Sequence, residues 1–390
     1  MKKIISLAIL LMVCTAMSAQ SANSVLKAME TANKHFMAVH PDPSTPTNVN
    51  KIRTSNLWTR AVYYEGLVEL IKLEKEVGSS QLEQNTKYIN DWADFHKWSP
   101  RDGVTTRNAD NYCCGQAYID WTVANGGNSM SDELKPITEC MDNLLKGEDS
   151  VHDWTWIDAI HMGLPVLTSL ARLKSEEGDK ESGLRYANQG WMMYSWIRNT
   201  LAGGLFNREE GLWWRDKDFT PPYKAPNGEN CYWSRGNGWV YMALVRAMED
   251  LKNVEGAEEQ VRIYKSDYFK MTKALLACQR QDYFWNVDLL DDSDFGGKEL
   301  TGTSMFVYGL AWGVNTGVLP NEVFSKLIKK TWKSMVKKCL HRNGFLGYVQ
   351  GTGKQPSDSQ PVNYNHEPDF DDFGLGSFLL AGSEVYKMLK

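Results

Sequence analysis

Apolar residues recur at spacings of three and four along most of the chain, as in Leu57, Ala61, Tyr64 and Val68. Side chains at this spacing share one face of an α-helix, so the pattern predicts amphipathic helices. Gly, Pro and Asn-Gly pairs separate the segments, and counting between them gives about twelve helices. They are expected near residues 24–38, 55–76, 80–97, 109–124, 131–146, 154–173, 181–200, 235–252, 258–280, 301–316, 320–340 and 372–389.

The predicted helices are of two kinds. Residues 154–173 and 301–314 are apolar on more than one face, whereas residues 81–98 have a broad polar face. Inner helices touch neighbours on all sides and outer helices touch them on one side only. The alternation therefore predicts an all-α fold of two concentric layers. Because no linker interrupts the series, we expect one domain over residues 20–390.

One long segment, residues 203–232, departs from the helical pattern. It is rich in Gly, Pro and aromatic residues and contains Gly204-Leu-Phe and Gly211-Leu-Trp-Trp. This composition predicts a strand pair followed by a long loop. Long loops in a compact domain are usually functional, so a role in binding is expected here.

The N-terminus has the order of a secretory signal peptide over residues 1–19. Lys2 and Lys3 precede an apolar run that ends in small residues. Later segments are too short to cross a membrane, so an exported protein without a membrane span is expected. The formal net charge of −5 becomes more negative without these lysines, which argues against a nucleic-acid partner. Six further cysteines show no metal or disulfide spacing, and buried free thiols are expected.

An acidic residue, Asp158, stands in an apolar and aromatic segment after Trp154 and Trp156. Asp153, at the start of this segment, is expected to cap the helix, because an Asp side chain accepts hydrogen bonds from the free amides of a first turn. Asp158 is expected beyond the first turn, where burial favours the carboxylic acid over the carboxylate. Such a group can act as a general acid. Asp158 is therefore a candidate proton donor, the alternative being a core acid bonded to a neighbouring helix.

A second acid, Asp110, lies at a predicted loop-to-helix boundary within Arg107-Asn-Ala-Asp110-Asn111-Tyr. Asp is favoured as a cap at such positions, so a capping role and a chemical role are both open. If the carboxyl groups of Asp110 and Asp158 face each other, their repulsion helps to keep one of them protonated.

A third cluster is Tyr232-Trp-Ser-Arg-Gly-Asn-Gly-Trp239. Trp233 and Trp239 offer flat faces for a sugar ring, and Gly236 lets the backbone approach a ligand closely. Arg235 provides a planar fork for a carboxylate. No second histidine or cysteine stands at metal spacing from His161, so neither a metal nor a cofactor is expected.

Three motifs together resemble glycoside hydrolase family 105, the unsaturated rhamnogalacturonyl hydrolases. They are Trp156-x-Asp158-x-x-x-Met162, Trp233-x-Arg235-Gly-Asn-Gly-Trp239 and Glu299-Leu-Thr-Gly-Thr-Ser304. The resemblance extends from about Trp58 to the C-terminus. It implies an (α/α)6 barrel of six helical hairpins, in agreement with the twelve predicted helices.

The resemblance also implies an activity, the removal of a 4,5-unsaturated uronic acid from oligosaccharides derived from pectin or rhamnogalacturonan. In that mechanism Asp158 protonates C4 of the double bond, water adds at C5, and the resulting hemiketal opens to release the next sugar. Asp110 matches the second acid of the pocket. Trp156, Met162 and the segment 233–239 line the site of the terminal sugar, with Arg235 as the partner of its carboxylate.

One position departs from the family pattern. Many members have a histidine after the Gly-Leu-aromatic pair, where this chain has Gly211-Leu-Trp-Trp-Arg215. Arg215 is therefore expected to bind a second sugar that is more acidic or differently linked. Two alternatives remain open: a related hydrolase acting on unsaturated glycosaminoglycan fragments, and a sugar-binding barrel without catalytic activity.

Overall fold

A helix forms at each of the twelve predicted positions in the computed structural model, which describes residues 21–46 and 52–390. The predicted signal peptide, residues 1–19, lies outside the described residues. No helix in the described ranges is both long and apolar enough to cross a membrane. The six cysteines after residue 20 are free thiols, and all except Cys278 are buried, as expected.

The helices alternate between two layers along the chain. The outer layer consists of α2 (Ala22–Val39), α4 (Leu82–Phe95), α7 (Lys135–Lys146), α9 (Lys180–Asn199), α11 (Glu258–Ala277) and α13 (Asn321–Cys339). The inner layer consists of α3 (Trp58–Val77), α6 (Cys114–Ala124), α8 (Asp158–Glu176), α10 (Ser234–Leu251), α12 (Leu300–Asn315) and α14 (Asp372–Leu389). In α12 every residue from 300 to 313 is buried, whereas α13 buries a single stripe, so the side-chain pattern assigns each helix to its layer.

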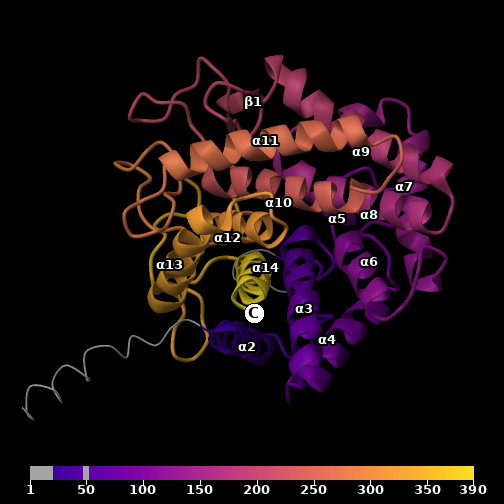
Figure 1. The fold of residues 1–390 in the computed structure, drawn as a ribbon, viewed down its shortest axis with the longest axis horizontal. Helices are drawn as coiled ribbons and strands as arrows, with labels where there is room; N and C mark the ends of the chain where they lie inside the picture. The colour runs from indigo at the N-terminus through magenta and orange to yellow at the C-terminus, as the bar shows by residue number, and fades with distance from the viewer. Residues whose placement is uncertain (1–20, 47–51) are drawn as a thin grey trace, which may run out of the picture.

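The inner helices form a closed ring in the order α3, α6, α8, α10, α12 and α14, and α14 packs back against α3 (Figure 1). Small residues allow this last contact. A Cβ atom added to Gly376 would lie 2.2 Å from the carbonyl oxygen of Val62, and one added to Gly66 would lie 2.5 Å from the carbonyl oxygen of Gly376. The fold is therefore the predicted (α/α)6 double-layered barrel, with its hydrophobic core between and within the two layers.

The two ends of the barrel differ in the length of their loops. Each inner helix is entered from the preceding outer helix through a long segment: residues 40–57, of which 40–46 and 52–57 are described, 96–108, 147–157, 200–233, 278–299 and 340–371. The return segments at the other end are short, such as residues 78–81 and 177–179. The long segments therefore gather around the N-terminal ends of the inner helices, where a binding site can be built.

Shorter elements lie between the long helices. On the way into the inner helices they are α5 (Ala109–Tyr112), the 3₁₀ helices η2 (Ser150–His152), η3 (Leu201–Gly203) and η4 (Lys217–Phe219), and the strands β1 (Phe206–Asn207) and β2 (Leu212–Trp213). The 3₁₀ helix η1 (Asp132–Leu134) lies in the return segment before α7. The two strands pair antiparallel, as predicted for residues 203–232.

The start of α8 differs from the prediction, because the helix begins at Asp158 and not near residue 154. The backbone before it pairs instead with the long loop: Trp156 forms an antiparallel bridge with Asp216, and the amide of Ile157 donates to the carbonyl of Arg215 over 2.9 Å. Asp158 is thus the first residue of the helix rather than a residue beyond its first turn.

The expected capping role of Asp153 is wrong. Its carboxylate accepts two hydrogen bonds from Arg107, at 2.7 and 2.6 Å, outside the helix. This ion pair links the segment before α5 to the segment before α8. The first segment leads to Asp110 in α5, and the second leads to Asp158 at the start of α8.

Candidate active site

A cleft of about 800 Å³ opens at the N-terminal ends of the inner helices. Trp58 at the start of α3, Asp158 at the start of α8 and Trp233 immediately before α10 all line it. Backbone amides at helix N-termini carry partial positive charge, so several converging helix starts favour an anionic ligand. The cleft therefore suits a negatively charged molecule.

Two carboxyl groups, those of Asp110 and Asp158, line this cleft together. Burial raises the pKa of Asp110 to about 6, and the negative charge of Asp158 acts in the same direction. The positive charges of Arg53, Arg215 and Arg101 oppose this rise. The charges of the two acids therefore interact, as the sequence suggested, and Asp110 holds its proton to a higher pH than an ordinary aspartate does.

Asp158 is bonded to an arginine. Its side chain, 11% exposed, accepts a hydrogen bond from Nε of Arg215 over 3.1 Å. Of the two acids, Asp110 is the one whose pKa is raised by burial.

Asp110 is not the cap of its helix. The side chain of Asn108 accepts from the amide of Asp110 over 3.0 Å and fills that role. The carboxyl group of Asp110 is therefore left for the cleft, which removes the capping alternative.

Arg215 is held at the cleft wall by the loop that carries it. Its Nη1 atom donates to Asp216 over 2.7 Å, while its Nε atom donates to Asp158. The bridge between Trp156 and Asp216 fixes the backbone beside these contacts. The side chain of Arg215 remains 20% exposed and lines the cleft, so a ligand there can reach it.

Aromatic and thioether side chains form much of the remaining wall. Trp156 is half-buried, Trp233 and Met162 are almost fully buried, and all three line the cleft. The indole nitrogen of Trp233 donates to the side chain of Gln350 over 2.8 Å, which fixes the plane of its ring. Flat apolar faces beside charged groups suit a sugar ring that carries a carboxylate.

Three predicted binding residues, Arg235, Gly236 and Trp239, do not line the cleft. The side chain of Trp239 is fully buried and stacks on His161, with 5.0 Å between ring centroids. A Cβ atom at Gly236 would lie 3.3 Å from Ile157, so this glycine allows α10 to pack closely against the segment before α8.

Arg235 was expected to contact a substrate carboxylate, and the structure contradicts this expectation. Its side chain is fully buried between the rings of Trp233 and Phe373. The guanidinium group donates to the backbone carbonyls of Gln350 and Gly351 over 2.6 and 2.8 Å. Arg235 therefore supports the cleft wall from behind.

Several lining residues carried no recognisable sequence signal. Polar examples are Arg53, Arg101, Thr352 and Asp358. They come from three different long segments and meet only through the closure of the barrel. Arg53 lies over the rings of Trp58 and Phe370, at 5.8 and 4.8 Å, which holds its charge at the cleft rim.

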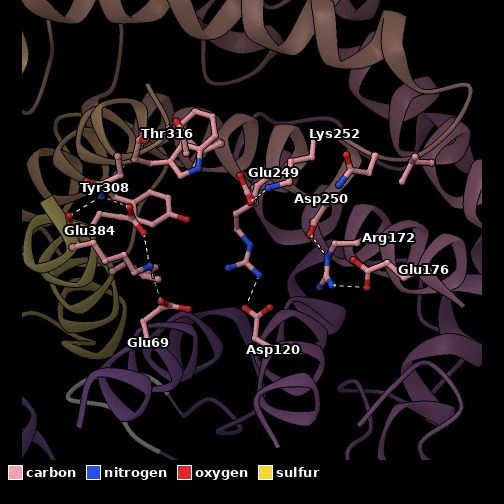
Figure 2. Close-up of a pocket in the computed structure, with 18 of the residues that line it drawn as sticks. Glu69, Asp120, Arg172, Glu176, Glu249, Asp250, Lys252, Tyr308, Thr316 and Glu384 are labelled. Carbon is pink, nitrogen blue, oxygen red and sulfur yellow. Dashed lines mark hydrogen bonds and ion pairs between the residues drawn. The ribbon is translucent and has the colours of Figure 1, made fainter. Parts of the chain in front are cut away.

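A second cavity of about 740 Å³ lies among the C-terminal ends of the inner helices (Figure 2). Its charges are paired with one another: Arg172 donates to Asp250 over 3.0 Å, Arg246 donates to Asp120 over 2.6 Å, and Lys387 contacts two further carboxylates. Such a network stabilises the closed end of the barrel. The cleft at the opposite end, with incompletely paired arginines, is the better candidate for the active site.

The described ranges contain no group of three or more His, Cys, Asp or Glu side chains arranged to hold a metal ion.

Comparison with known proteins places this geometry in a family. A model described as Glycosyl Hydrolase Family 88 matches residues 28–389. A protein of Formosa agariphila named unsaturated 3S-rhamnoglycuronyl hydrolase is 28% identical over 349 residues, covering 85% of this chain and 84% of its own length. A protein of the same name from an Alteromonas species is 28% identical over 357 residues, covering 86% of this chain and 78% of its own.

Solved structures show the same architecture. A family 88 glycosyl hydrolase from Bacteroides vulgatus superposes with a TM-score of 0.78 at 25% identity, covering 95% of this chain and all of that one. A family 105 glycoside hydrolase from C. acetobutylicum has a TM-score of 0.65 at 19% identity, with coverage of 92% and 98%. The resemblance to family 105 thus extends to the fold, and the match over residues 28–389 shows that this chain belongs to glycosyl hydrolase family 88.

Proposed function

We propose that this protein removes a 4,5-unsaturated uronic acid from the non-reducing end of an oligosaccharide by adding water to the C4–C5 double bond. The observation that carries the proposal is the pair of interacting acids, Asp110 and Asp158, in a cleft with arginines and tryptophans. The acids provide a proton, the arginines suit the sugar's carboxylate, and the tryptophans suit its ring. The names of the two relatives, which specify a glycuronyl group, support the same reaction.

The proposed reaction begins with proton transfer from Asp158 to C4. Water bonds to C5 and gives its proton to the acid pair, so that the pair starts and ends the cycle with one proton. The product carries a hydroxyl group at C5 next to the ring oxygen and is a hemiketal. The ring opens to a ketone at C5, and the hemiacetal left at C1 collapses to an aldehyde and releases the neighbouring sugar as an alcohol. No group attacks the anomeric carbon, in contrast to ordinary glycoside hydrolysis.

The roles of the two acids follow from their surroundings. The pair shares a proton, and its titration belongs to both members. Asp158 lies at the first turn of α8 beside Arg215, and Asp110 is the neighbour that holds the proton in reserve. Transfer of this proton from Asp110 would reprotonate Asp158 before each turnover.

For the leaving sugar we propose rhamnose, because the names of both relatives specify a rhamnoglycuronyl substrate. A pectin-derived rhamnogalacturonan fragment, as predicted from the sequence, meets this description. Arg53 makes no ion pair among the described residues, so an additional anionic group on the substrate can also be accommodated. Sulfated and unsulfated fragments therefore both belong in the substrate test.

The test measures loss of the ultraviolet absorbance of the conjugated enoate. Purified protein is incubated with the products of a rhamnogalacturonan lyase, with sulfated rhamnose-uronate fragments, and with unsaturated glycosaminoglycan disaccharides. We expect the band to disappear with a rhamnose-linked substrate and to persist with Asp158→Asn. Activity confined to glycosaminoglycan fragments would mean that the leaving sugar is an amino sugar and not rhamnose. Persistence of the band with every substrate, together with tight binding, would indicate a sugar-binding protein instead.

A further inference from the structure

The proposed proton donor is bonded to a cation. Nε of Arg215 donates to Oδ2 of Asp158 over 3.1 Å, so in the free enzyme this guanidinium group occupies an oxygen of the proposed donor. Arg215 also lines the cleft that the substrate enters. An incoming carboxylate therefore competes with Asp158 for Arg215.

The contacts of Arg215 show which bond can change. Its Nη1 atom is anchored to Asp216 over 2.7 Å, and the backbone beside it is fixed by the pairing of residues 215 and 216 with residues 156 and 157. The guanidinium group can therefore keep its Asp216 contact while its Nε atom changes partner. With 20% of the side chain exposed to the cleft, an incoming carboxylate can reach it.

We propose that Arg215 exchanges partners on substrate binding, leaving Asp158 for the carboxylate of the unsaturated uronic acid. This inference rests on the proposed function. Without its ion pair, and beside a newly bound anion, Asp158 takes up the proton held in the acid pair. Arg215 thus acts as a positioning residue that couples occupation of the cleft to the protonation of the donor.

The surrounding charges are consistent with such a transfer. Arg53 and Arg101 face the pair from the segments before α3 and α5, and Asp358 faces the cleft from the segment before α14. Outside the cleft lining, Nε2 of His161 lies 3.2 Å from Oε2 of Glu65, and both side chains are fully buried. Asp110 lines the cleft, and its charge interacts with that of Asp158, so it is the proton source proposed for the donor.

A binding experiment tests the exchange without turnover. Digalacturonate has a terminal carboxylate but no double bond, so its affinity can be measured by calorimetry. Arg215→Gln should weaken binding about 10- to 100-fold, as for loss of a charged hydrogen bond. Asp158→Asn should strengthen binding several-fold, because Arg215 is no longer shared, and this gain should vanish when Arg215→Gln is also present.

A matched control is Lys217→Gln, which removes an exposed cation from the same loop and should leave the affinity unchanged. Equal effects of Asp158→Asn with and without Arg215 would show that the two groups do not compete for the ligand and would overturn the exchange. Lack of binding to the wild-type protein would overturn it as well. Neither result depends on enzymatic activity, so failure of the exchange is distinguishable from failure of the proposed function.

The pH profile of kcat/KM supplies a second readout. Arg215 lowers the proton affinity of the acid pair, so Arg215→Gln should move the alkaline limb upward by about one pH unit. Arg215→Lys keeps the charge and should keep the limb near its wild-type position. A purely structural role would lower kcat in both variants without moving the limb, and an unmoved limb in Arg215→Gln would contradict the exchange.

Discussion

Replacing Arg235 by methionine separates a structural role from a substrate-binding role. The guanidinium group donates two hydrogen bonds to backbone carbonyls, at 2.6 and 2.8 Å, in a fully buried position. Hydrogen bonds that involve a charged group contribute about 1.5–3 kcal/mol each, so the variant should lose about 3–6 kcal/mol of unfolding free energy. With an unfolding entropy of about 2.1 cal/mol/K per residue over roughly 370 residues, the melting temperature should fall by about 4–8 °C.

The assay combines calorimetric or spectroscopic melting with measurement of KM on the unsaturated substrate. Lysine has a single ammonium group in place of the planar fork of arginine, so Arg235→Lys should not bond both carbonyls. This variant should therefore recover only part of the lost stability. Arg215→Met is the matched control, because this partly exposed arginine should affect KM far more than the melting temperature. An unchanged melting temperature for Arg235→Met, with a raised KM, would refute the structural role and restore the sequence-based expectation of a carboxylate contact.

Three further predictions follow from particular residues. Because the pKa of Asp110 is raised to about 6, its ionisation should cost the folded state up to about 3 kcal/mol as pH rises from about 4 to above 6. Asp110→Asn should abolish turnover and should remove this pH-dependent loss of stability, measured by denaturant titration. Equal pH dependence of stability in the wild-type and variant proteins would contradict this prediction. Gly376→Ala places a Cβ atom 2.2 Å from the carbonyl of Val62 and should destabilise the closure between α3 and α14 by about 1–3 kcal/mol or more, measured by denaturant unfolding. Export should remove residues 1–19, so N-terminal sequencing of the secreted protein should begin near Gln20, and retention of Lys2 and Lys3 in the exported chain would contradict the predicted signal peptide.

Helical periodicity was sufficient to predict the architecture, because each inner helix has to bury all its faces and each outer helix only one. It could not place the first turn of α8. Residues 154–157 continue the apolar pattern, yet Trp156 bridges Asp216 and the amide of Ile157 donates to the carbonyl of Arg215, both on a distant loop. Long-range backbone pairing of this kind has no local signature.

The candidate site was predictable in its chemistry and less so in its geometry. Asp158 stood out because an acid in an apolar run needs a reason, Asp110 because it lies at a loop-to-helix boundary, and Trp156 because it stands beside Asp158 in an aromatic run. Arg235 and Trp239 lie within two turns of Trp233, but residues near one another along a helix point in different directions, and of these three only Trp233 lines the cleft. Arg53 and Arg101 are isolated in sequence and gain their importance only when the long segments meet.

The central claim, addition of water to a carbon–carbon double bond, is tested most directly by following the vinylic H4 signal of the substrate by proton NMR. The reaction proposed here predicts that this signal disappears at the rate at which the released sugar appears, and that Asp158→Asn stops both processes. Release of the sugar while the vinylic signal persists would show direct cleavage at the anomeric carbon and would contradict the mechanism.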